Sequence, residues 1–341
     1  MTSISRQVRL PVQFTSFSGL PEGLRYARWD GGSAFPSDPA EVEFYVPPLV
    51  QDVDIISRPL GRMTSLRAVQ ALSSGTDELC ARLRRLPGNV KLFNAKGVHA
   101  RSTAELALAL ILASLRGIPE FTHAQDFRLW KPEVFPSLYG RSVLIVGWGA
   151  LGSALEDLVV PFECAMTRVA RTARLSPRGP VHAVSHLPEL IAGADVVVLA
   201  TELTPATRRL AGAGLLARMR DGALLVNVAR GAVIDTAALL EEVRGGRIRA
   251  ALDVTDPEPL PAGHPLWETP GVSGGRIRAA LDVTDPEPLP AGHPLWETPG
   301  VLITPHIGAF TPTMWPRLEQ LIRRQLERFA ANEELDNAVA Y

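Results

Sequence analysis

The sequence SVLIVGWGALG, residues 142–152, decides the fold of this chain. Residues 143–146 are apolar and largely β-branched, which predicts a strand buried on both faces. Three glycines then follow with the G-x-G-x-x-G spacing, and helix-forming residues come after them. In this order the glycines permit a tight turn, the approach of a pyrophosphate to the backbone, and close packing of helix on strand. The stretch therefore predicts a dinucleotide site made of Gly147, Trp148, Gly149, Ala150, Leu151 and Gly152.

The composition is that of a globular protein of about two domains. The chain has 341 residues, of which 46% are hydrophobic and 21% charged, and its net charge is −1. This charge offers no electrostatic basis for binding nucleic acid or an anionic membrane. We find neither a signal peptide nor an apolar run of about 18 residues, so no membrane span is expected. Cys80 and Cys164 lack metal-ligand spacing, which predicts reduced thiols in a cytoplasmic protein and no metal site.

The first hundred residues contain short strand patterns separated by Pro and Gly. The predicted strands are 8–12, 24–29, 42–46, 68–72 and 90–94. Ser74 and Gly75 follow the fourth strand, at the end where open α/β sheets bind ligands, although an ordinary turn explains them equally well. Residues 101–115 predict a helix that is apolar on nearly every side and therefore buried between domains or subunits. A Gly-Ile-Pro sequence ends it near residue 118, where we place a domain boundary, and an aromatic, loop-rich segment 120–140 follows.

Strands and helices alternate after the glycine stretch. The predicted strands are 166–170, 181–184, 194–200 and 223–228, and the predicted helices are 215–219 and 236–243. This alternation is typical of a doubly wound parallel sheet of the Rossmann type.

The end of the second strand of this sheet bears on the choice of cofactor. An NAD site usually places Asp or Glu there, where it accepts a hydrogen bond from the ribose 2′-hydroxyl. Here the sequence VARTAR, 169–174, has no acid and two arginines, Arg171 and Arg174. Guanidinium groups pair with a 2′-phosphate, so we favour NADP over NAD. The alternative is that both arginines are solvated on a surface loop.

Two further residues suit the reduction of a carbonyl group. Arg230 follows a buried strand beside a glycine, although an isolated arginine there is often only a surface residue. His306 is preceded by Pro305 and followed by backbone containing glycine, which holds it rigidly. Carbonyl reduction requires a proton donor, a cation that polarises the oxygen or holds a carboxylate, and a group that orients the donor. Histidine, arginine and glutamate supply these three roles.

Together these motifs resemble the D-isomer-specific 2-hydroxyacid dehydrogenase family. The matching stretches extend over nearly the whole chain and are SSGTD (73–77), TAELALALILASLR (103–116), VGWGALG (146–152), LLVNVARGAVIDTAAL (224–239), ALDVTDPEPLP (251–261) and LITPHIGAFT (302–311). The resemblance implies an α/β homodimer in which each chain has two domains. Residues 1–117 and 310–341 would form a flavodoxin-like substrate-binding domain. Residues 118–309 would form a Rossmann-type NAD(P)-binding domain.

The resemblance also implies roles for individual residues. His306 would be the acid/base that protonates the carbonyl oxygen of a 2-keto acid, and a glutamate would hydrogen-bond it and raise its pKa. Arg230 would bind the carboxylate and polarise the carbonyl, and the backbone of Ser74 and Gly75 would also hold the carboxylate. Further cofactor contacts would come from Thr103, Val228, Ala229, Asp253 and Asp282. Within the family the chain looks most like a glyoxylate/hydroxypyruvate reductase, which transfers a hydride from NAD(P)H to give the D-2-hydroxy acid.

One feature departs from the family pattern. Residues 245–272 recur identically at 274–301, which is 29 positions later. Two copies do not make a solenoid, so the near identity indicates a recent duplication or a sequence error rather than an architectural repeat. We expect the sheet to have one place for the repeated strand RAAL. The other copy would then become a surface excursion or add at an edge, where it exposes apolar surface.

The repeat leaves the catalytic glutamate in two copies. Glu258 keeps the family spacing from Arg230, whereas Glu287 keeps the family spacing to His306. Because the run into His306 is continuous, it would hold Glu287 and His306 in one rigid unit, and we favour Glu287.

Alternative functions differ at these same residues. Formate dehydrogenases share the fold, but their pattern has Gln beside the histidine, where this chain has Glu in both copies. A nucleotide-sensing corepressor is a second alternative, but the complete Arg, Glu and His set favours an enzyme. The third alternative is a catalytically impaired nucleotide-binding member of the family, because of the duplicated segment.

Overall fold

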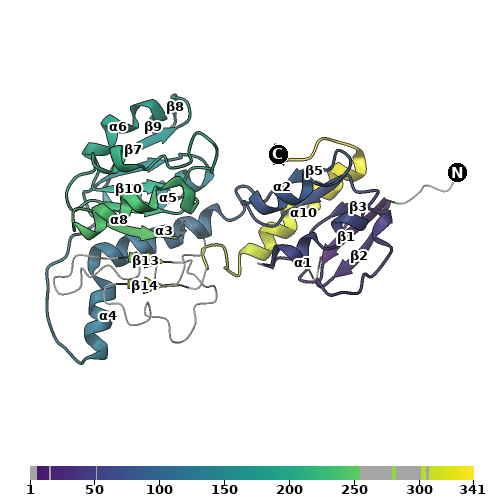
Figure 1. Ribbon diagram of the computed structural model, residues 1–341, viewed down its shortest axis with the longest axis horizontal. Helices are drawn as coiled ribbons and strands as arrows, with labels where there is room; N and C mark the ends of the chain where they lie inside the picture. Colours follow the sequence, from purple (N-terminus) through teal and green to yellow (C-terminus); the bar gives the residue numbers. More distant parts are fainter. Residues whose placement is uncertain (1–5, 15–16, 51, 254–278, 282–300, 305–306) are drawn as a thin grey trace. The chain divides into compact units, whose positions relative to one another are not determined.

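The computed structural model describes residues 6–14, 17–50, 52–253, 279–281, 301–304 and 307–341. Contacts divide the chain into two compact units, Met1–His99 with Thr311–Tyr341 and Ala100–Phe310 (Figure 1). The sequence places the boundary near residue 118, but α3 (Ala100–Arg116) shares one apolar core with α5 (Ala150–Val159) and so belongs to the second unit. No helix among the described residues has the length and apolarity to cross a membrane.

The first unit is built on a sheet with strand order β15-β5-β4-β3-β1-β2. Its strands are β1 (Arg6–Pro11), β2 (Leu24–Trp29), β3 (Val42–Tyr45), β4 (Ala68–Gln70), β5 (Lys91–Phe93) and β15 (Ala338–Val339). Strands β1 to β5 are parallel, and β15 is antiparallel to β5. The order 2-1-3-4-5 is that of flavodoxin-like sheets, so this part of the fold prediction is confirmed.

The helices of the first unit include the last helix of the chain. They are α1 (Val53–Ser57), α2 (Asp77–Leu83) and α10 (Met314–Ala331). Leu318, Ile322 and Leu326 recur every four residues along α10, so they form one face, and all three are fully buried. This face packs on Val8 and Phe44 of the sheet. The C-terminal segment therefore completes the core of the first unit, as the sequence predicts.

The second unit is built on a larger sheet with strand order β14-β13-β12-β11-β10-β6-β7-β9-β8. Its strands are β6 (Ser142–Val146), β7 (Ala165–Ala170), β8 (Arg174–Ser176), β9 (Gly179–Ala183), β10 (Val196–Leu199), β11 (Leu224–Asn227), β12 (Arg249–Leu252), β13 (Ala279–Leu281) and β14 (Val301–Ile303). Strands β9-β7-β6-β10-β11-β12 follow the Rossmann order 3-2-1-4-5-6 and are parallel. The prediction of a doubly wound sheet is therefore confirmed.

Helices cover both faces of this sheet. These are α3 and α5 on one face and α6 (Leu187–Leu190), α7 (Ala213–Leu216) and α8 (Thr236–Arg244) on the other, while the remaining α-helix of this unit is α4 (Ile118–Asp126). Val196 and Val198 of β10 pack with α3 and α5, whereas Val197 and Leu199 pack with α6, α7 and α8. Alternate residues of a strand point to opposite faces, so a continuously apolar strand is buried on both.

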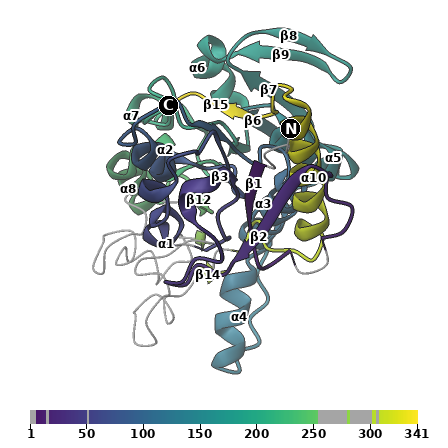
Figure 2. The same cartoon turned by 90° about the vertical axis from the view of Figure 1, so that its right-hand side faces the viewer.

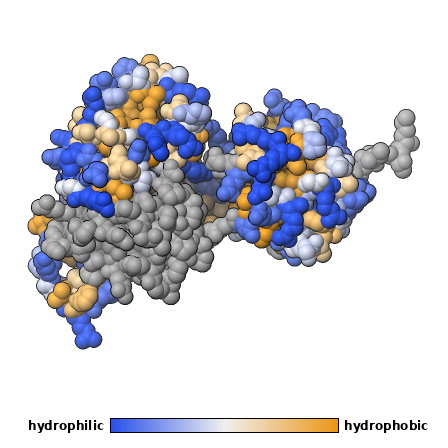
Figure 3. All heavy atoms as spheres, in the orientation of Figure 1, coloured by the Kyte–Doolittle hydropathy of each residue, from blue (hydrophilic) through white to orange (hydrophobic). Residues whose placement is uncertain are grey.

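Two elements of the second unit differ from the sequence expectation. The segment after α3, expected to be a loop, begins with α4, because Gly117 at φ 64° ends one helix and Pro119 fits the first turn of the next. Figure 2 shows α4 extending away from the sheet of its unit. Figure 3 shows apolar atoms exposed over α4 and the chain after it, where Phe127, Trp130 and Val134 are exposed. Strand β8, antiparallel to β9, was also not predicted.

Both copies of the repeat contribute a strand to this sheet. Strand β12 of the first copy lies beside β11, and β13 of the second copy lies between β12 and β14. The expectation of a single place for the repeated strand is therefore wrong. The physical reason is that a strand inside a sheet has backbone partners on both edges, which a loop or an edge strand lacks.

Candidate active site

The glycine loop lies where the strand order of the second sheet reverses, between β6 and β10. Gly147 has φ 100°, and a Cβ placed on it would lie 2.5 Å from the backbone carbonyl carbon of Ala200. The backbone N–H groups of Gly147 and Trp148 both donate to the carbonyl oxygen of Val169, each over 2.9 Å. The loop is therefore fixed against the carboxyl ends of β7 and β10, at the switch point where open α/β sheets bind ligands.

The second and third glycines have different surroundings. A Cβ on Gly152 would lie 2.7 Å from the carbonyl oxygen of Gly147, so this glycine permits close packing of α5 on the loop. A Cβ on Gly149 would meet no atom within 4 Å. Gly149 is the N-cap of α5 and has no side chain that could accept from the first-turn N–H groups. The loop therefore fits a pyrophosphate, with open space at Gly149 and N–H donors of the helix terminus beside it.

The two arginines after β7 differ in position. The Arg174 Nη2 donates to the carbonyl oxygen of Trp148 over 2.8 Å, and its guanidinium group lies over the indole ring, 5.5 Å from the centroid. Arg171 is exposed in the turn between β7 and β8. The structure therefore places Arg174, one of the two arginines predicted to contact a ribose phosphate, against the glycine loop.

A buried ion pair beneath the loop was missed by sequence reasoning. Glu156 of α5 is 1% exposed, and the Arg168 Nε donates to its two carboxylate oxygens over 3.0 and 2.9 Å. The Trp148 Nε1 donates to Oε2 of the same carboxylate over 2.6 Å. These bonds fix the indole on which Arg174 lies. The available signal was that Glu156 follows Leu155 on a largely apolar helix, because a carboxylate is rarely buried without a partner.

The carboxyl end of β11 holds Arg230 through Asn227. Asn227 is fully buried, and its Nδ2 donates to the Arg230 carbonyl oxygen over 3.0 Å while its Oδ1 accepts from the Ala229 N–H over 3.1 Å. The half-buried Arg230 side chain donates through Nη1 to the Ala229 carbonyl oxygen over 2.7 Å. Val228 and Ala229 are buried beside it. Sequence reasoning did not select Asn227, although a lone amide in an apolar strand was the signal for it.

Two other predicted residues lie at the same edge of the sheet. Asp253 follows β12, is 8% exposed, and donates its backbone N–H to the Asn227 carbonyl oxygen over 2.8 Å. The Thr103 Oγ1 of α3 donates to the Gly308 carbonyl oxygen over 3.5 Å. The chain that follows β14 therefore lies beside the first turns of α3. Glu258, Asp282, Glu287 and His306 lie outside the described residues.

Ser74 and Gly75 belong to the first unit, where they follow β4. The Asn94 Nδ2 donates to the Ser74 carbonyl oxygen over 3.0 Å, and the Ser73 Oγ donates to the Gly75 carbonyl oxygen over 2.7 Å. These bonds fix a loop at the carboxyl end of a parallel sheet, and the Ser74 side chain is exposed. The position is one where such sheets bind ligands.

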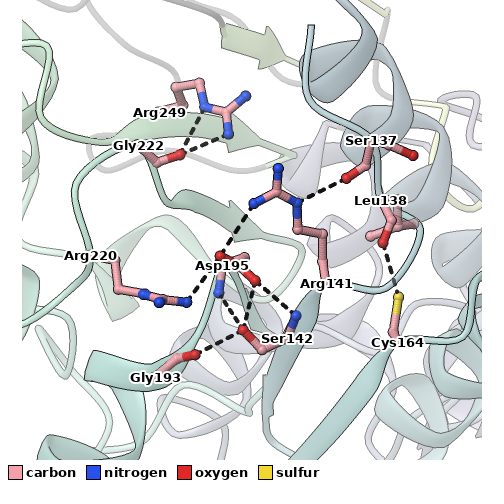
Figure 4. A network of polar contacts seen from close by, with 10 residues as sticks. All are labelled: Ser137, Leu138, Arg141, Ser142, Cys164, Gly193, Asp195, Arg220, Gly222 and Arg249. Carbon is pink, nitrogen blue, oxygen red and sulfur yellow. Dashed lines mark hydrogen bonds and ion pairs between the residues drawn. The ribbon is translucent and has the colours of Figure 1, made fainter.

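A cavity of about 240 Å³ lies at the opposite, amino edge of the second sheet. Asp195, at its wall, accepts hydrogen bonds from Ser142 and pairs with Arg141 and Arg220 (Figure 4). Because dinucleotides bind at the carboxyl edge, this cavity is separate from the candidate site. Among the described residues, no group of three His, Cys, Asp or Glu side chains could hold a metal ion.

The chain matches the family model described as "D-isomer specific 2-hydroxyacid dehydrogenase, NAD binding domain" in two pieces, residues 108–274 and 272–308. The human glyoxylate reductase/hydroxypyruvate reductase is 34% identical over 215 residues, which are 59% of this chain and 64% of the human one.

Solved structures agree with this match. A D-isomer-specific 2-hydroxyacid dehydrogenase family protein from Aeromonas salmonicida is 25% identical with a TM-score of 0.75, covering 98% of this chain and 99% of its own. A D-isomer-specific 2-hydroxyacid dehydrogenase from Xanthobacter autotrophicus, solved with NADPH and MES, is 26% identical with a TM-score of 0.73, covering 98% of each chain. The chain therefore belongs to the D-isomer-specific 2-hydroxyacid dehydrogenase family, whose members are NAD(P)-dependent oxidoreductases.

Proposed function

We propose that this protein reduces a small 2-keto acid, of the glyoxylate or hydroxypyruvate type, to the D-2-hydroxy acid and prefers NADPH to NADH. The contact of Arg174 with Trp148 carries the cofactor preference, because it puts a guanidinium group at the glycine loop with no acid in the segment 169–174. The relatives named glyoxylate and hydroxypyruvate reductases support the substrate class.

The second unit would hold the cofactor. The N–H groups at the start of α5 bind the pyrophosphate, and Arg171 and Arg174 bind the 2′-phosphate. The rest of the cofactor would lie along the carboxyl edge of the sheet, which is lined by Val228, Ala229, Thr103 and Asp253. When bound, NADPH supplies the hydride.

The first unit would hold the substrate, as the position of the Ser74 loop after β4 suggests. The backbone of Ser74 and Gly75 and the guanidinium group of Arg230 bind the substrate carboxylate. His306 donates a proton to the carbonyl oxygen, and Glu287 or Glu258 keeps it protonated until then. Asn227 keeps the Arg230 backbone in place through its two hydrogen bonds.

The test is the initial rate of NADPH and NADH oxidation by the purified chain with hydroxypyruvate and with glyoxylate. Faster oxidation of NADPH supports the proposal. If NADPH binds but neither cofactor is oxidised with any small 2-keto acid, the activity is rejected, and the chain is a catalytically impaired member of its family. The extra strand β13 favours this second candidate, since it changes the sheet that carries the site.

We also propose a homodimer in the cytoplasm. Free Cys80 and Cys164 suit a reducing compartment. Trp130 and Val134, after α4, are 96% and 98% exposed, which a partner subunit would cover. Changing both to Ser should convert a dimer to a monomer in light scattering. The control Leu175→Ser changes a side chain that is 87% exposed on β8 and should leave the dimer intact. A monomer in the unchanged protein contradicts the proposal.

A further inference from the structure

The two copies of the repeat use opposite edges of what is the same strand. In the first copy, Ala250 and Leu252 of β12 pair with Leu225 and Asn227 of β11. In the second copy, the equivalent residues of β13 pair instead with β14, Ala279 with Val301 and Leu281 with Ile303. The first copy therefore takes the partner that precedes the repeat, and the second copy takes the partner that follows it.

The two copies share fewer register pairs with each other than with their outer neighbours among the described residues. Within the part of the chain that the structure describes, strands β12 and β13 are joined by one register pair, Leu252 with Leu281, which are the same residue of the repeated sequence. Four pairs join β11 to β12, and three join β13 to β14. A single strand could therefore replace the two copies. One of its edges would pair with β11 and the other with β14, and the described register pairs with both neighbours would be kept.

From this geometry we propose that the second copy is an inserted strand that places β14, the strand before His306 in the sequence, one strand too far from β11, the strand before Arg230. The inference rests on the proposed function. Parallel strands lie about 4.8 Å apart, so β11 and β14 are separated by roughly 14 Å across three steps, against roughly 10 Å in a sheet with a single copy. The substrate carboxylate and carbonyl are adjacent groups, so we expect an extra strand between β11 and β14 to keep the residues that follow them in the sequence, Arg230 and His306, from acting on both groups together.

Two observations that do not depend on the strand pairing support the proposal of an inserted strand. The family model matches 108–274 and then begins again at 272, so each piece holds one copy of the repeat. Removing one copy gives a single glutamate with the family spacing to both Arg230 and His306. The family pattern therefore fits the chain with one copy removed.

The test is deletion of 245–273, compared with the unchanged chain. Deleting 273–301 instead gives the identical protein, so the experiment does not depend on which copy is original. We expect kcat/KM for hydroxypyruvate with NADPH to rise at least ~100-fold, since misplacing a reacting group by even 1 Å costs roughly that factor. The Kd for NADPH should change less than about twofold, because the glycine loop is untouched.

A second variant controls for misfolding of the deletion variant. It also separates the effect of the inserted strand from the effect of the added chain length. It keeps the first copy and all of β14 and replaces 273–300 with a Gly/Ser linker of equal length, which closes as a loop at little cost. This variant should reach the activity of the deletion variant. If the unchanged chain is active and both variants fold and bind NADPH without exceeding its activity, the inference is overturned.

A crystal structure of the deletion variant separates failure of the inference from failure of the proposed function. A sheet in which the remaining copy pairs with both β11 and β14 supports the inserted strand even if no 2-keto acid is reduced by any of the proteins. In that case the proposed activity alone is rejected. Any other strand order overturns the inference.

Discussion

Arg174 donates a hydrogen bond to the main-chain carbonyl oxygen of Trp148 over 2.8 Å, and its guanidinium group lies over the indole of that residue. Trp148 is in turn held by the buried carboxylate of Glu156. The arginine is therefore positioned by the same loop that suits the pyrophosphate. A cationic group fixed in this way favours a cofactor with a 2′-phosphate over one with a 2′-hydroxyl.

Replacing Arg174 with Ala should raise KM for NADPH and leave KM for NADH nearly unchanged. A hydrogen bond to a charged group is worth about 1.5–3 kcal/mol, or roughly 10- to 100-fold in binding. Steady-state kinetics with both cofactors measures the effect. Arg218→Ala, an exposed arginine after α7, is the control and should change neither constant. An equal change with both cofactors would refute the assignment.

The glycine loop offers a matched pair of substitutions. In Gly149→Ala the new methyl group meets no atom within 4 Å, so stability should not change, but the methyl fills the space next to the helix terminus. We expect NADPH affinity to fall on the order of tenfold or more. In Gly152→Ala the methyl would lie 2.7 Å from the Gly147 carbonyl oxygen, which should destabilise the fold by about 1–3 kcal/mol. Thermal unfolding and NADPH titration separate the two; loss of stability in Gly149→Ala contradicts the prediction.

Patterns within short stretches of the sequence were sufficient to predict much of the fold. Residues 143–146 are apolar without interruption because β6 is buried on both faces, and the glycine spacing reflects contacts within a few residues, such as Gly152 with Gly147. Asp253 was selected from a motif as a cofactor contact, and it follows β12 at the carboxyl edge of the sheet.

Contacts between distant elements could not be predicted in this way. Glu156 and Arg168 meet because α5 packs beside β7, which no periodicity reveals. The two copies of the repeat have identical local patterns, so the sequence cannot show that Leu252 and Leu281 become neighbours. The order of strands is set by packing across the whole sheet.

Removing the carboxylate of Glu156 should strongly destabilise the second unit. Glu156→Ala leaves the Arg168 charge, in a side chain 10% exposed, without its partner, and breaking such a buried pair costs about 3–5 kcal/mol. Asp157→Ala is the control, because its ion pair with Arg178 is exposed and should be worth less than about 1 kcal/mol. Urea unfolding of both variants gives the comparison. A similar loss of unfolding free energy in the two variants would show that the buried ion pair stabilises the fold no more than the exposed one.

Stability should also depend on pH through Asp195. Burial alone would raise its pKa, but hydrogen bonds from Ser142 and the guanidinium groups of Arg141 and Arg220 hold the pKa below its usual value (Figure 4). The ionised carboxylate therefore stabilises the fold above about pH 4, and this contribution is lost as the pH falls through the lowered folded-state pKa. Asp195→Asn should cost about 1 kcal/mol at pH 7, and the difference from the unchanged protein should shrink below about pH 4. Urea unfolding between pH 7 and pH 3 measures it, with Asp221→Asn, whose side chain is 88% exposed, as the control. A difference that stays constant over this range would show that the Asp195 charge does not stabilise the fold.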